Sequence, residues 1–211
     1  MHIGVFDSGK GGEFVAAKLR LLLPENQYTV INDRNHAPYG ERPYQEIRSL
    51  TETAIQPLLP ICDMIVLACN TASAAAIDHL RTTYPDMVFV GFEPMIKPAM
   101  LHSTNAHITL LATAATASAP RTQQLVERYA TDATIDKPTT FGWASAIDDG
   151  RADAIDLSEV AKSVAAGSDA ILISCTHYME LQSRLEQLGV TVLEPTEPVA
   201  RRIQTLMQAS R

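Results

Sequence analysis

Several features are scarce in this 211-residue chain, and each scarcity excludes a class of protein. Aromatic residues make up 6%, with a single tryptophan, which argues against a base-stacking surface for single-stranded nucleic acid. Three cysteines, an odd number, do not suggest a disulfide framework. The net charge is −7 and no cluster of Lys or Arg stands out, so nucleic acid and anionic membranes are poor partners.

Long hydrophobic runs are missing as well. No apolar run approaches the length of a membrane-spanning helix. The first residues lead directly into IGVF, without the basic region and long apolar region of a secretory signal. The histidines show no ligand spacing with cysteines or carboxylates, so we expect no zinc or other metal site. These features together predict a cytoplasmic protein.

Short apolar runs alternate with helical stretches along the chain, which predicts βα units and a mostly parallel sheet. Hydrophobic residues make up 46%, enough for a packed core. Proline pairs within 91–100 and 193–200 predict two connections between lobes. We therefore expect a first α/β lobe of residues 1–93 plus 195–211 and a second of residues 94–194.

The predicted elements follow from these patterns, with boundaries good to a few residues. The strands are expected at 2–6, 27–32, 64–68, 88–91, 107–111, 170–174 and 190–193, with a weaker one near 138–142. The helices are expected at 12–23, 44–59, 71–83, 117–130, 157–166, 177–188 and 196–209.

Two cysteines in matching settings carry the strongest signal. Cys69 follows the run MIVLA and opens CNTAS, while Cys175 follows AILIS and opens CTHY. Each stands between a buried strand and a predicted helix, where unpaired N–H groups and the helix dipole favour a thiolate. Two such thiols, one per half, predict two bases acting on one substrate. Cys62 has no such setting and is interpreted as a small buried hydrophobe.

The segment IGVFDSGKGG places Asp7 and Ser8 after the first strand and a glycine pair at the start of a helix. This pattern predicts a backbone pocket for an anion, either a carboxylate or a phosphate. It matches neither a Walker A motif nor GxGxxG, and a helix cap with a tight turn is the alternative. After the second strand, Tyr39 and Gly40 lie in a turn that could bring N–H groups and a hydroxyl to a ligand.

Three further polar residues follow predicted strands. His177 lies two residues past Cys175 and could stabilise a thiolate or relay a proton, with a helix-start cap as the alternative. Thr113 and Thr116 stand at the start of another helix, where hydroxyls three residues apart can bind a carboxylate. Capping threonines are common, so this last signal is weak by itself.

Taken together, the segments FDSGKGG, DRNHAPYG, ACNTAS, LATAAT and SCTHY resemble those of glutamate racemases, in the aspartate/glutamate racemase superfamily, in order and approximate spacing. The likeness runs from the first strand to the last helix. Aspartate racemases usually carry a different N-terminal glycine pattern and Cys-Thr-Glu in place of Cys-Thr-His, which favours glutamate. The resemblance implies two similar lobes with the active site in the cleft between them, a small amino-acid substrate, no cofactor, a homodimer, and a supply of D-glutamate for peptidoglycan.

The resemblance also implies a role for each residue. Cys69 and Cys175 would flank the α-carbon, one removing its proton as thiolate and the other returning a proton on the opposite face. Asp7 would assist Cys69, and His177 would assist Cys175. The substrate contacts would come from Ser8, Tyr39, Gly40, Asn70, Thr71, Thr113, Thr116 and Thr176.

The chain departs from this family in several places. Its second lobe is shorter, the usual Cys-Pro is absent after Phe141, and Asp148 stands where a glutamate is common. Met179 replaces a proline, while Lys10 and Glu13 replace small or apolar residues. None of these changes removes a base. Three alternatives stay open: a racemase for another acidic amino acid such as aspartate, a degenerate carboxylate-binding protein without turnover, and a phosphate- or nucleotide-binding protein that uses DSGKGG.

Overall fold

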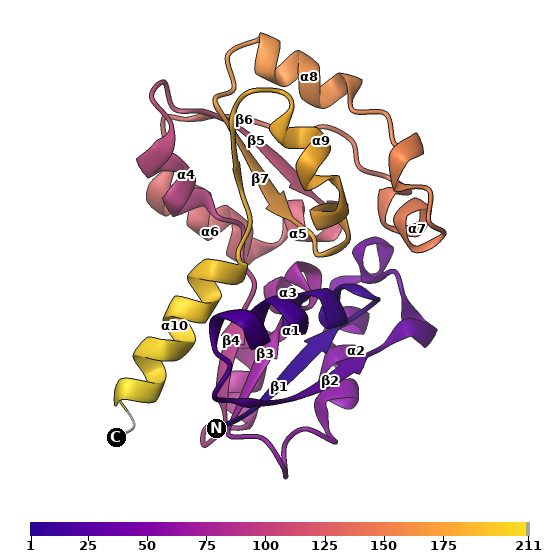
Figure 1. The fold of residues 1–211 in the computed structure, drawn as a ribbon, viewed down its shortest axis with the longest axis vertical. Coiled ribbons are helices and arrows are strands. Elements are labelled where there is room, and N and C mark those ends of the chain that lie inside the picture. Colours follow the sequence, from indigo (N-terminus) through magenta and orange to yellow (C-terminus); the bar gives the residue numbers. More distant parts are fainter. Residues whose placement is uncertain (210–211) are drawn as a thin grey trace. The chain divides into compact units, whose positions relative to one another are not determined.

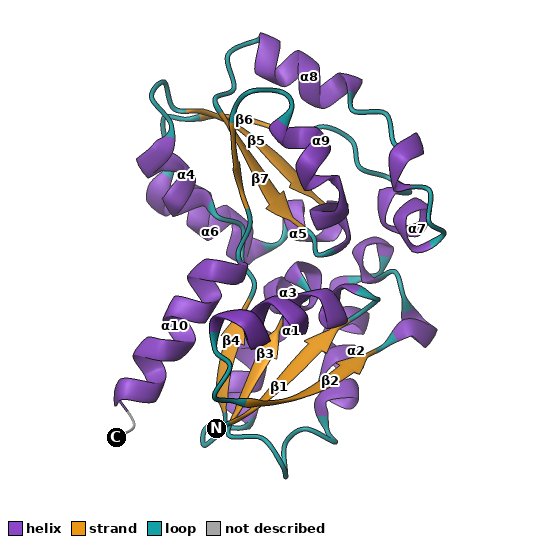
Figure 2. Cartoon of the chain, viewed as in Figure 1, coloured by secondary structure: helices purple, strands orange, loops and turns teal. Residues whose placement is uncertain are grey.

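The computed structural model describes residues 1–209, which form two compact units. The first unit comprises Met1–Phe92 together with the described residues from Pro195 onward, and the second comprises Glu93–Glu194. Each unit holds a four-stranded parallel sheet flanked by helices (Figures 1 and 2). The predicted α/β class with two similar lobes is therefore confirmed.

The sheet of the first unit has the strand order β2-β1-β3-β4, with every neighbouring pair parallel. Its central strands are buried throughout except for His2, the first residue of β1, because helices cover both faces of a parallel sheet. This is why they appear in the sequence as continuous apolar runs. The strands are β1 (His2–Asp7), β2 (Gln27–Asn32), β3 (Met64–Leu67) and β4 (Val88–Gly91).

Helices of the first unit pack in two pairs. α2 packs against α3, and α1 packs against α10, the returning C-terminal helix, which also contacts β4. Two 3-10 turns, η1 and η2, connect β2 to α2. The bounds are α1 (Gly11–Leu22), η1 (Arg34–His36), η2 (Tyr39–Glu41), α2 (Tyr44–Ile55), α3 (Asn70–Thr83) and α10 (Thr196–Ala209).

The second unit repeats this topology, with strand order β6-β5-β7-β8. As in the first unit, the first strand lies between the second and the third. The strands are β5 (His107–Ala112), β6 (Thr134–Asp136), β7 (Ala170–Ser174) and β8 (Thr191–Leu193). The helices are α4 (Ile96–His102), α5 (Ala114–Ser118), α6 (Pro120–Tyr129), α7 (Trp143–Asp148), η3 (Ala152–Ala154), α8 (Ser158–Ala165), η4 (His177–Leu181) and α9 (Gln182–Glu186).

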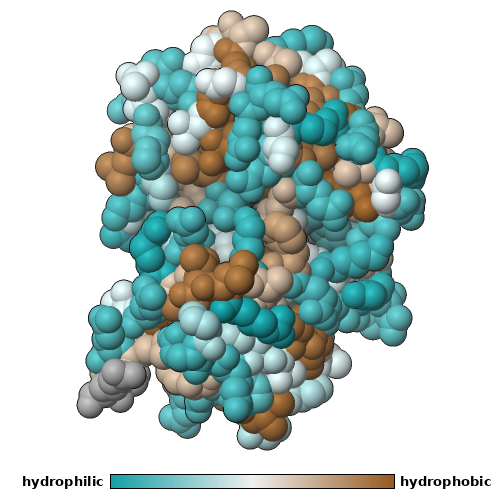
Figure 3. All heavy atoms as spheres, in the orientation of Figure 1, coloured by the Kyte–Doolittle hydropathy of each residue, from teal (hydrophilic) through white to brown (hydrophobic). Residues whose placement is uncertain are grey.

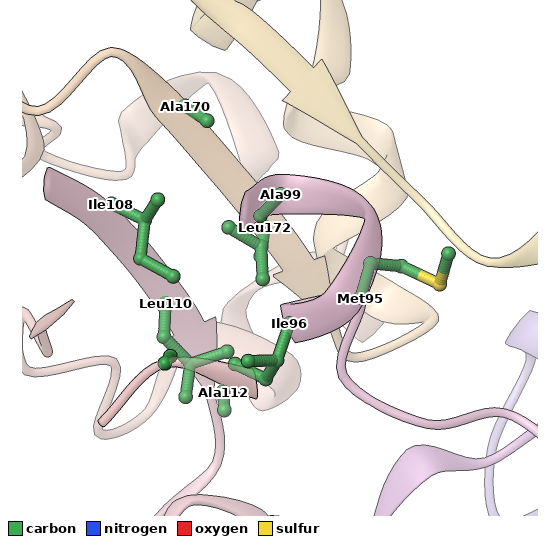
Figure 4. Close-up of a cluster of buried hydrophobic side chains, with 9 residues drawn as sticks. Met95, Ile96, Ala99, Ile108, Leu110, Ala112, Ala170 and Leu172 are labelled. Carbon is green, nitrogen blue, oxygen red and sulfur yellow. The ribbon is translucent and has the colours of Figure 1, made fainter. Parts of the chain in front are cut away.

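The core of the second unit lies between its two central strands and α4. Figure 4 shows Ile108 and Leu110 of β5 and Leu172 of β7 beside Ile96 and Ala99 of α4, and all five are buried. Alternation along each strand directs one set of side chains to this face. The cluster holds β5 and β7 together, so that the residues after them start from fixed positions.

Several predicted elements differ in the structure. The weak strand near 138–142 is wrong: the edge strand is β6, and the later segment contains Pro138 and the left-handed Gly142 (φ 75°). The helix predicted at 117–130 is two helices, because Ala119 before Pro120 is extended. The helix predicted at 177–188 starts as the 3-10 helix η4 and continues as α9. The short helices α4 and α7 were not predicted.

The face shown in Figure 3 is largely hydrophilic, with smaller hydrophobic patches. One brown patch lies over α1, whose exposed apolar residues are Phe14, Leu21 and Leu22. None of the helices within residues 1–209 combines the length and the apolarity that a membrane crossing requires.

Candidate active site

The topology explains where the predicted site residues lie. In each sheet the strand order reverses beside the first strand, between β1 and β3 and between β5 and β7. Open α/β sheets bind ligands outside the carboxyl ends of their strands at such a reversal. Ser8 follows β1 and Cys69 follows β3, while Thr113 follows β5 and Cys175 follows β7. Both thiols therefore stand at the position where this architecture places binding sites.

Cys69 is the N-cap of α3, as the sequence predicts. Its Sγ accepts a hydrogen bond from the N–H of Ala72 at 3.4 Å, and the hydroxyl of Ser8 lies 3.2 Å from the same sulfur. The residue is only 6% exposed. Helix N–H groups, the helix dipole and a hydroxyl all favour negative charge on this sulfur. The arrangement can therefore support a thiolate in a nearly dry environment.

The loop after β1 is packed as tightly as its glycines suggest. Asp7 is fully buried, and its carboxylate accepts a hydrogen bond from the N–H of Gly9 at 2.8 Å. A Cβ atom on Gly12 would lie 2.3 Å from Oδ1 of Asn32 and 2.9 Å from Cβ of Asp7. Only glycine fits there, so part of the DSGKGG motif serves close packing around Asp7.

Asn70, the first residue of α3, has a buried carboxamide with unmet hydrogen-bonding capacity. The residue is 1% exposed, and neither its Oδ1 nor its Nδ2 has a partner within the described residues. An unpaired buried polar group costs roughly 1–3 kcal/mol. Because Asn70 directly follows Cys69, its amide is suited to a polar ligand beside that thiol. The neighbouring Thr71 is buried as well.

Tyr39 lies in η2, which packs against α3. Its hydroxyl donates a hydrogen bond to Oδ2 of Asp33 at 2.7 Å. Burial, together with this hydrogen bond, raises the pKa of Tyr39 far above its ordinary value. The phenol therefore stays protonated, and toward a ligand its oxygen can only accept. Asp33, whose Oδ1 lies 2.8 Å from Nδ1 of His36, was not among the predicted site residues. Its place at the start of the segment DRNHAPYG was the available sequence signal.

Cys175 has a different support. Its Sγ lies 3.7 Å from Nδ1 of His177, and Nε2 of the same ring lies 3.2 Å from Oδ2 of Asp148. Cys175 and His177 are 7% and 6% exposed. An imidazole between a thiol and a carboxylate can orient itself on the carboxylate and exchange a proton with the sulfur. The structure thus places Asp148, which lies on α7, at the ring nitrogen of His177 opposite the one that faces Cys175.

The setting of Cys175 is not the helix N-terminus that the sequence suggests. The residue lies in a bend before η4, a five-residue 3-10 helix that begins at His177. Thr176 between them is buried. So short a 3-10 helix aligns few peptide dipoles. The polar environment of Cys175 therefore comes from the imidazole, whereas that of Cys69 comes from the start of α3 and Ser8.

Thr113 and Thr116 form the predicted pair at the start of a helix. Thr113 is the N-cap of α5, and its Oγ1 accepts from the N–H of Thr116 at 3.2 Å and donates to Oγ1 of Thr116 at 3.0 Å. The capping role is therefore confirmed. The pair stands after β5, beside the strand that leads to Cys175.

No group of three or more His, Cys, Asp or Glu side chains arranged to hold a metal ion occurs among residues 1–209.

Comparisons with known proteins give a consistent result. The Asp/Glu/Hydantoin racemase family matches residues 16–203. A glutamate racemase of Herpetosiphon aurantiacus is 37% identical, covering 99% of this chain and 85% of that protein. One of Ectopseudomonas mendocina is 34% identical, covering 97% of this chain and 81% of that protein. The crystal structure of Escherichia coli glutamate racemase, in complex with L-glutamate and the activator UDP-MurNAc-ala, has a TM-score of 0.83 at 30% identity, covering 98% of this chain and 82% of that one.

Proposed function

Because the chain belongs to the Asp/Glu/Hydantoin racemase family, we propose that it is an amino-acid racemase, of the isomerase class, that interconverts L-glutamate and D-glutamate. The proposal is supported by relatives named glutamate racemase that are 34% and 37% identical to the chain over nearly all its length. A solved glutamate racemase with L-glutamate bound, 30% identical, has a similar fold.

One observation carries the proposal: each unit places a nearly buried thiol at the strand-order reversal of its sheet, beside groups that handle charge or protons. Cys69 has Ser8 and the start of α3, and Cys175 has His177 and Asp148. A single base would serve one face of a substrate carbon. Two independently supported thiols fit a reaction in which a proton leaves one face and another arrives at the opposite face.

In the reaction, the thiolate of one cysteine takes the α-proton and becomes a thiol, leaving a planar carbanion. The thiol of the other cysteine then donates its proton to the opposite face and becomes a thiolate. The direction decides which of Cys69 and Cys175 acts as base. The α-proton is very weakly acidic, so the site must stabilise the carbanion with fixed dipoles in a space with little water.

The remaining polar residues provide these dipoles. The buried carboxamide of Asn70 would hydrogen-bond to the substrate, with Nδ2 donating to the carboxylate or Oδ1 accepting from the ammonium. The hydroxyl oxygen of Tyr39 would also accept from the ammonium. Asp7 would assist Cys69 through the loop that also carries Ser8, and His177 would assist Cys175 directly. The further substrate contacts would come from Gly40, Thr71, Thr113, Thr116 and Thr176.

We also propose the setting in which this activity is used. D-Glutamate formed in the cytoplasm would supply peptidoglycan synthesis and so support cell shape. The enzyme would act as a homodimer without a cofactor, which light scattering coupled to size-exclusion chromatography and an assay of dialysed protein would test.

The decisive experiment incubates purified protein with L-glutamate in deuterated water, under reducing conditions and without added cofactor. We expect D-glutamate by chiral chromatography and deuterium at the α-carbon by mass spectrometry. Cys69→Ser and Cys175→Ser should each lower the rate of inversion by at least about 10²-fold. Cys62→Ala, at the third buried cysteine, is the matched control and should racemise normally.

Absence of α-hydrogen exchange in wild-type protein would overturn the proposed activity. The same assay, run on a panel of L- and D-amino acids, tests the substrate. A clear preference for aspartate would make aspartate the substrate in place of glutamate. The shorter second lobe and Asp148 would be consistent with that result.

A further inference from the structure

We propose that Thr140 and Trp143 are positioning residues for Cys175, because they fix the segment that holds His177. The expected loss of racemisation rate rests on the proposed racemase function. The placement of His177 and Cys175 by these residues does not, since it is a property of the second unit alone. Neither residue belongs to the predicted site, and neither lies next to Cys175 in sequence. Their connection to it runs through Tyr178, the residue after His177.

Thr140 ties three parts of the second unit together. Its buried side-chain hydroxyl donates to the carbonyl of Ala112 at 2.8 Å, at the end of β5. Its own carbonyl accepts from the N–H of Trp143 at 3.1 Å and from the hydroxyl of Tyr178 at 3.4 Å. A single residue therefore links the carboxyl end of β5 to the start of α7 and to η4.

Tyr178 transmits this placement to the thiol. It is only 1% exposed, and its N–H donates to the carbonyl of Cys175 at 3.1 Å. Its ring meets the ring of Trp143 edge to face, with centroids 5.5 Å apart and planes at 71°. Aromatic pairs of this geometry add stabilisation beyond the area they bury. The tyrosine thus has one end on Cys175 and the other on Thr140 and Trp143.

The helix α7 then contacts two consecutive residues of η4. Trp143, its first residue, packs on Tyr178, and Asp148, its last, lies 3.2 Å from His177. Six residues are too few for an independently stable helix, and its N-cap, Gly142, provides no side-chain cap. The position of Asp148 therefore depends on the contacts that hold α7 in place, which are the buried Ile147 beside it and, at the other end of the helix, Thr140 and Trp143.

The consequence concerns one thiol only. Loosening the anchor would let the His177 imidazole move relative to Cys175 and Asp148, while Cys69 keeps its own support in the first unit. Displacements of about 1 Å at a catalytic group can cost up to about 10²-fold in rate. Substrate affinity should change less, because no group that binds substrate is removed.

The test compares Thr140→Val, which replaces the hydroxyl with a methyl group of similar size, with Thr140→Ser, which keeps the hydroxyl. Thr139→Val is the matched control, since Thr139 is the exposed neighbour of the same type. We expect Thr140→Val to lower kcat by about tenfold with little change in KM, Thr140→Ser to restore most of the activity, and Thr139→Val to resemble wild type. Trp143→Phe should lower kcat slightly, and Trp143→Ala should lower it strongly.

A second readout does not depend on turnover. Iodoacetamide labelling without substrate, resolved by peptide mass spectrometry, follows Cys69 and Cys175 separately within one sample. In Thr140→Val and Trp143→Ala the labelling rate of Cys175 should change by about threefold or more, because thiol reactivity depends on neighbouring groups. The rate of Cys69 should stay constant and serves as the internal reference.

The outcomes are distinguishable. Folded Thr140→Val and Trp143→Ala proteins in which both kcat and Cys175 labelling match wild type would overturn the proposal. Equal changes at Cys69 and Cys175 would overturn it too, since they would indicate general loosening. If Thr140→Val does not fold, Trp143→Ala and Trp143→Phe decide by the same labelling, with the larger change at Cys175 expected in Trp143→Ala. Wild-type protein that racemises nothing would reject the proposed function, while the labelling would still decide the positioning.

Discussion

His177 and Asp148, which are 29 positions apart in the sequence, face each other with Nε2 3.2 Å from Oδ2. The opposite nitrogen of the ring lies 3.7 Å from the sulfur of Cys175. The carboxylate thereby sets the orientation of the imidazole, since the hydrogen bond at one ring nitrogen determines what the other can do. This relationship is the basis for the role that we propose for Asp148 beside Cys175.

We predict that Asp148→Asn lowers kcat by about 10²-fold, because the amide no longer favours the ring orientation and charge that serve Cys175. Racemisation rates measured in both directions check this, with Asp149→Asn, on the exposed neighbour, as the control. Wild-type rates in Asp148→Asn would remove the carboxylate from the mechanism.

Ser8→Ala tests the support of the other thiol. Loss of the hydroxyl 3.2 Å from Sγ of Cys69 should lower kcat/KM by about tenfold, the cost of one hydrogen bond to a charged group. The free energy of unfolding should change little. Ser49→Ala, on the exposed side of α2, is the control and should keep full activity. Full activity in Ser8→Ala would assign the polar support of Cys69 to α3 alone.

Gly12→Ala should destabilise the chain by about 1–3 kcal/mol, because the new methyl group overlaps Asn32 and Asp7. Denaturant unfolding followed by circular dichroism measures the effect. The double variant with Asn32→Ala removes one of the two clashes, so it should recover at least about 0.5 kcal/mol relative to additivity. Strict additivity of the two substitutions would contradict the close approach.

Glu52 predicts a pH dependence of stability. A hydrogen bond with His79 at 2.8 Å is the main cause that lowers the pKa of Glu52 below its ordinary value of 4.5, with a smaller contribution from Tyr84. Because the folded-state pKa is the lower one, the contribution of Glu52 is present above pH 4.5 and is lost as the pH falls through the folded-state pKa.

Thermal unfolding of wild type and Glu52→Gln from pH 7 down to pH 3 tests this sign. The Tm of wild type should exceed that of the variant at neutral pH, and the difference should shrink on acidification. Glu127→Gln, on an exposed face of α6, provides the control. A difference that grows as the pH falls would reverse the assignment. The effect should be modest because the carboxylate is partly exposed.

Most of the sheets could be predicted from sequence because parallel strands are covered on both faces. Segments such as Met64–Leu67 and Ala170–Ser174 are buried throughout and therefore appear as uninterrupted apolar runs. The edge strand β6 has three residues, of which none is fully buried, so no such run marked it. The helices α4 and α7 are too short for their periodicity to be recognised.

The candidate site was predictable only where its residues adjoin in sequence. Cys69 before a helix start and His177 two residues after Cys175 follow from local spacing. The contacts of Ser8 with Cys69, 61 positions away, and of Asp148 with His177 depend on strand order and on how α7 packs. The support of Asp33 for Tyr39 depends on a turn that composition does not specify. Local patterns predicted where the two thiols lie relative to the strands, and tertiary packing determines which groups surround them.

The place of α10 has a consequence for the order in which the chain can fold during synthesis. This helix packs on α1 and β4 of the first unit, although the whole second unit precedes it in the chain. A ribosome therefore delivers every strand and helix of the second unit before the last piece of the first. The second unit can complete its core while the first still exposes the apolar surface that awaits its closing helix. A nascent chain halted near residue 194 should accordingly bind ribosome-associated chaperones through the first unit. A chain long enough to expose α10 should release them.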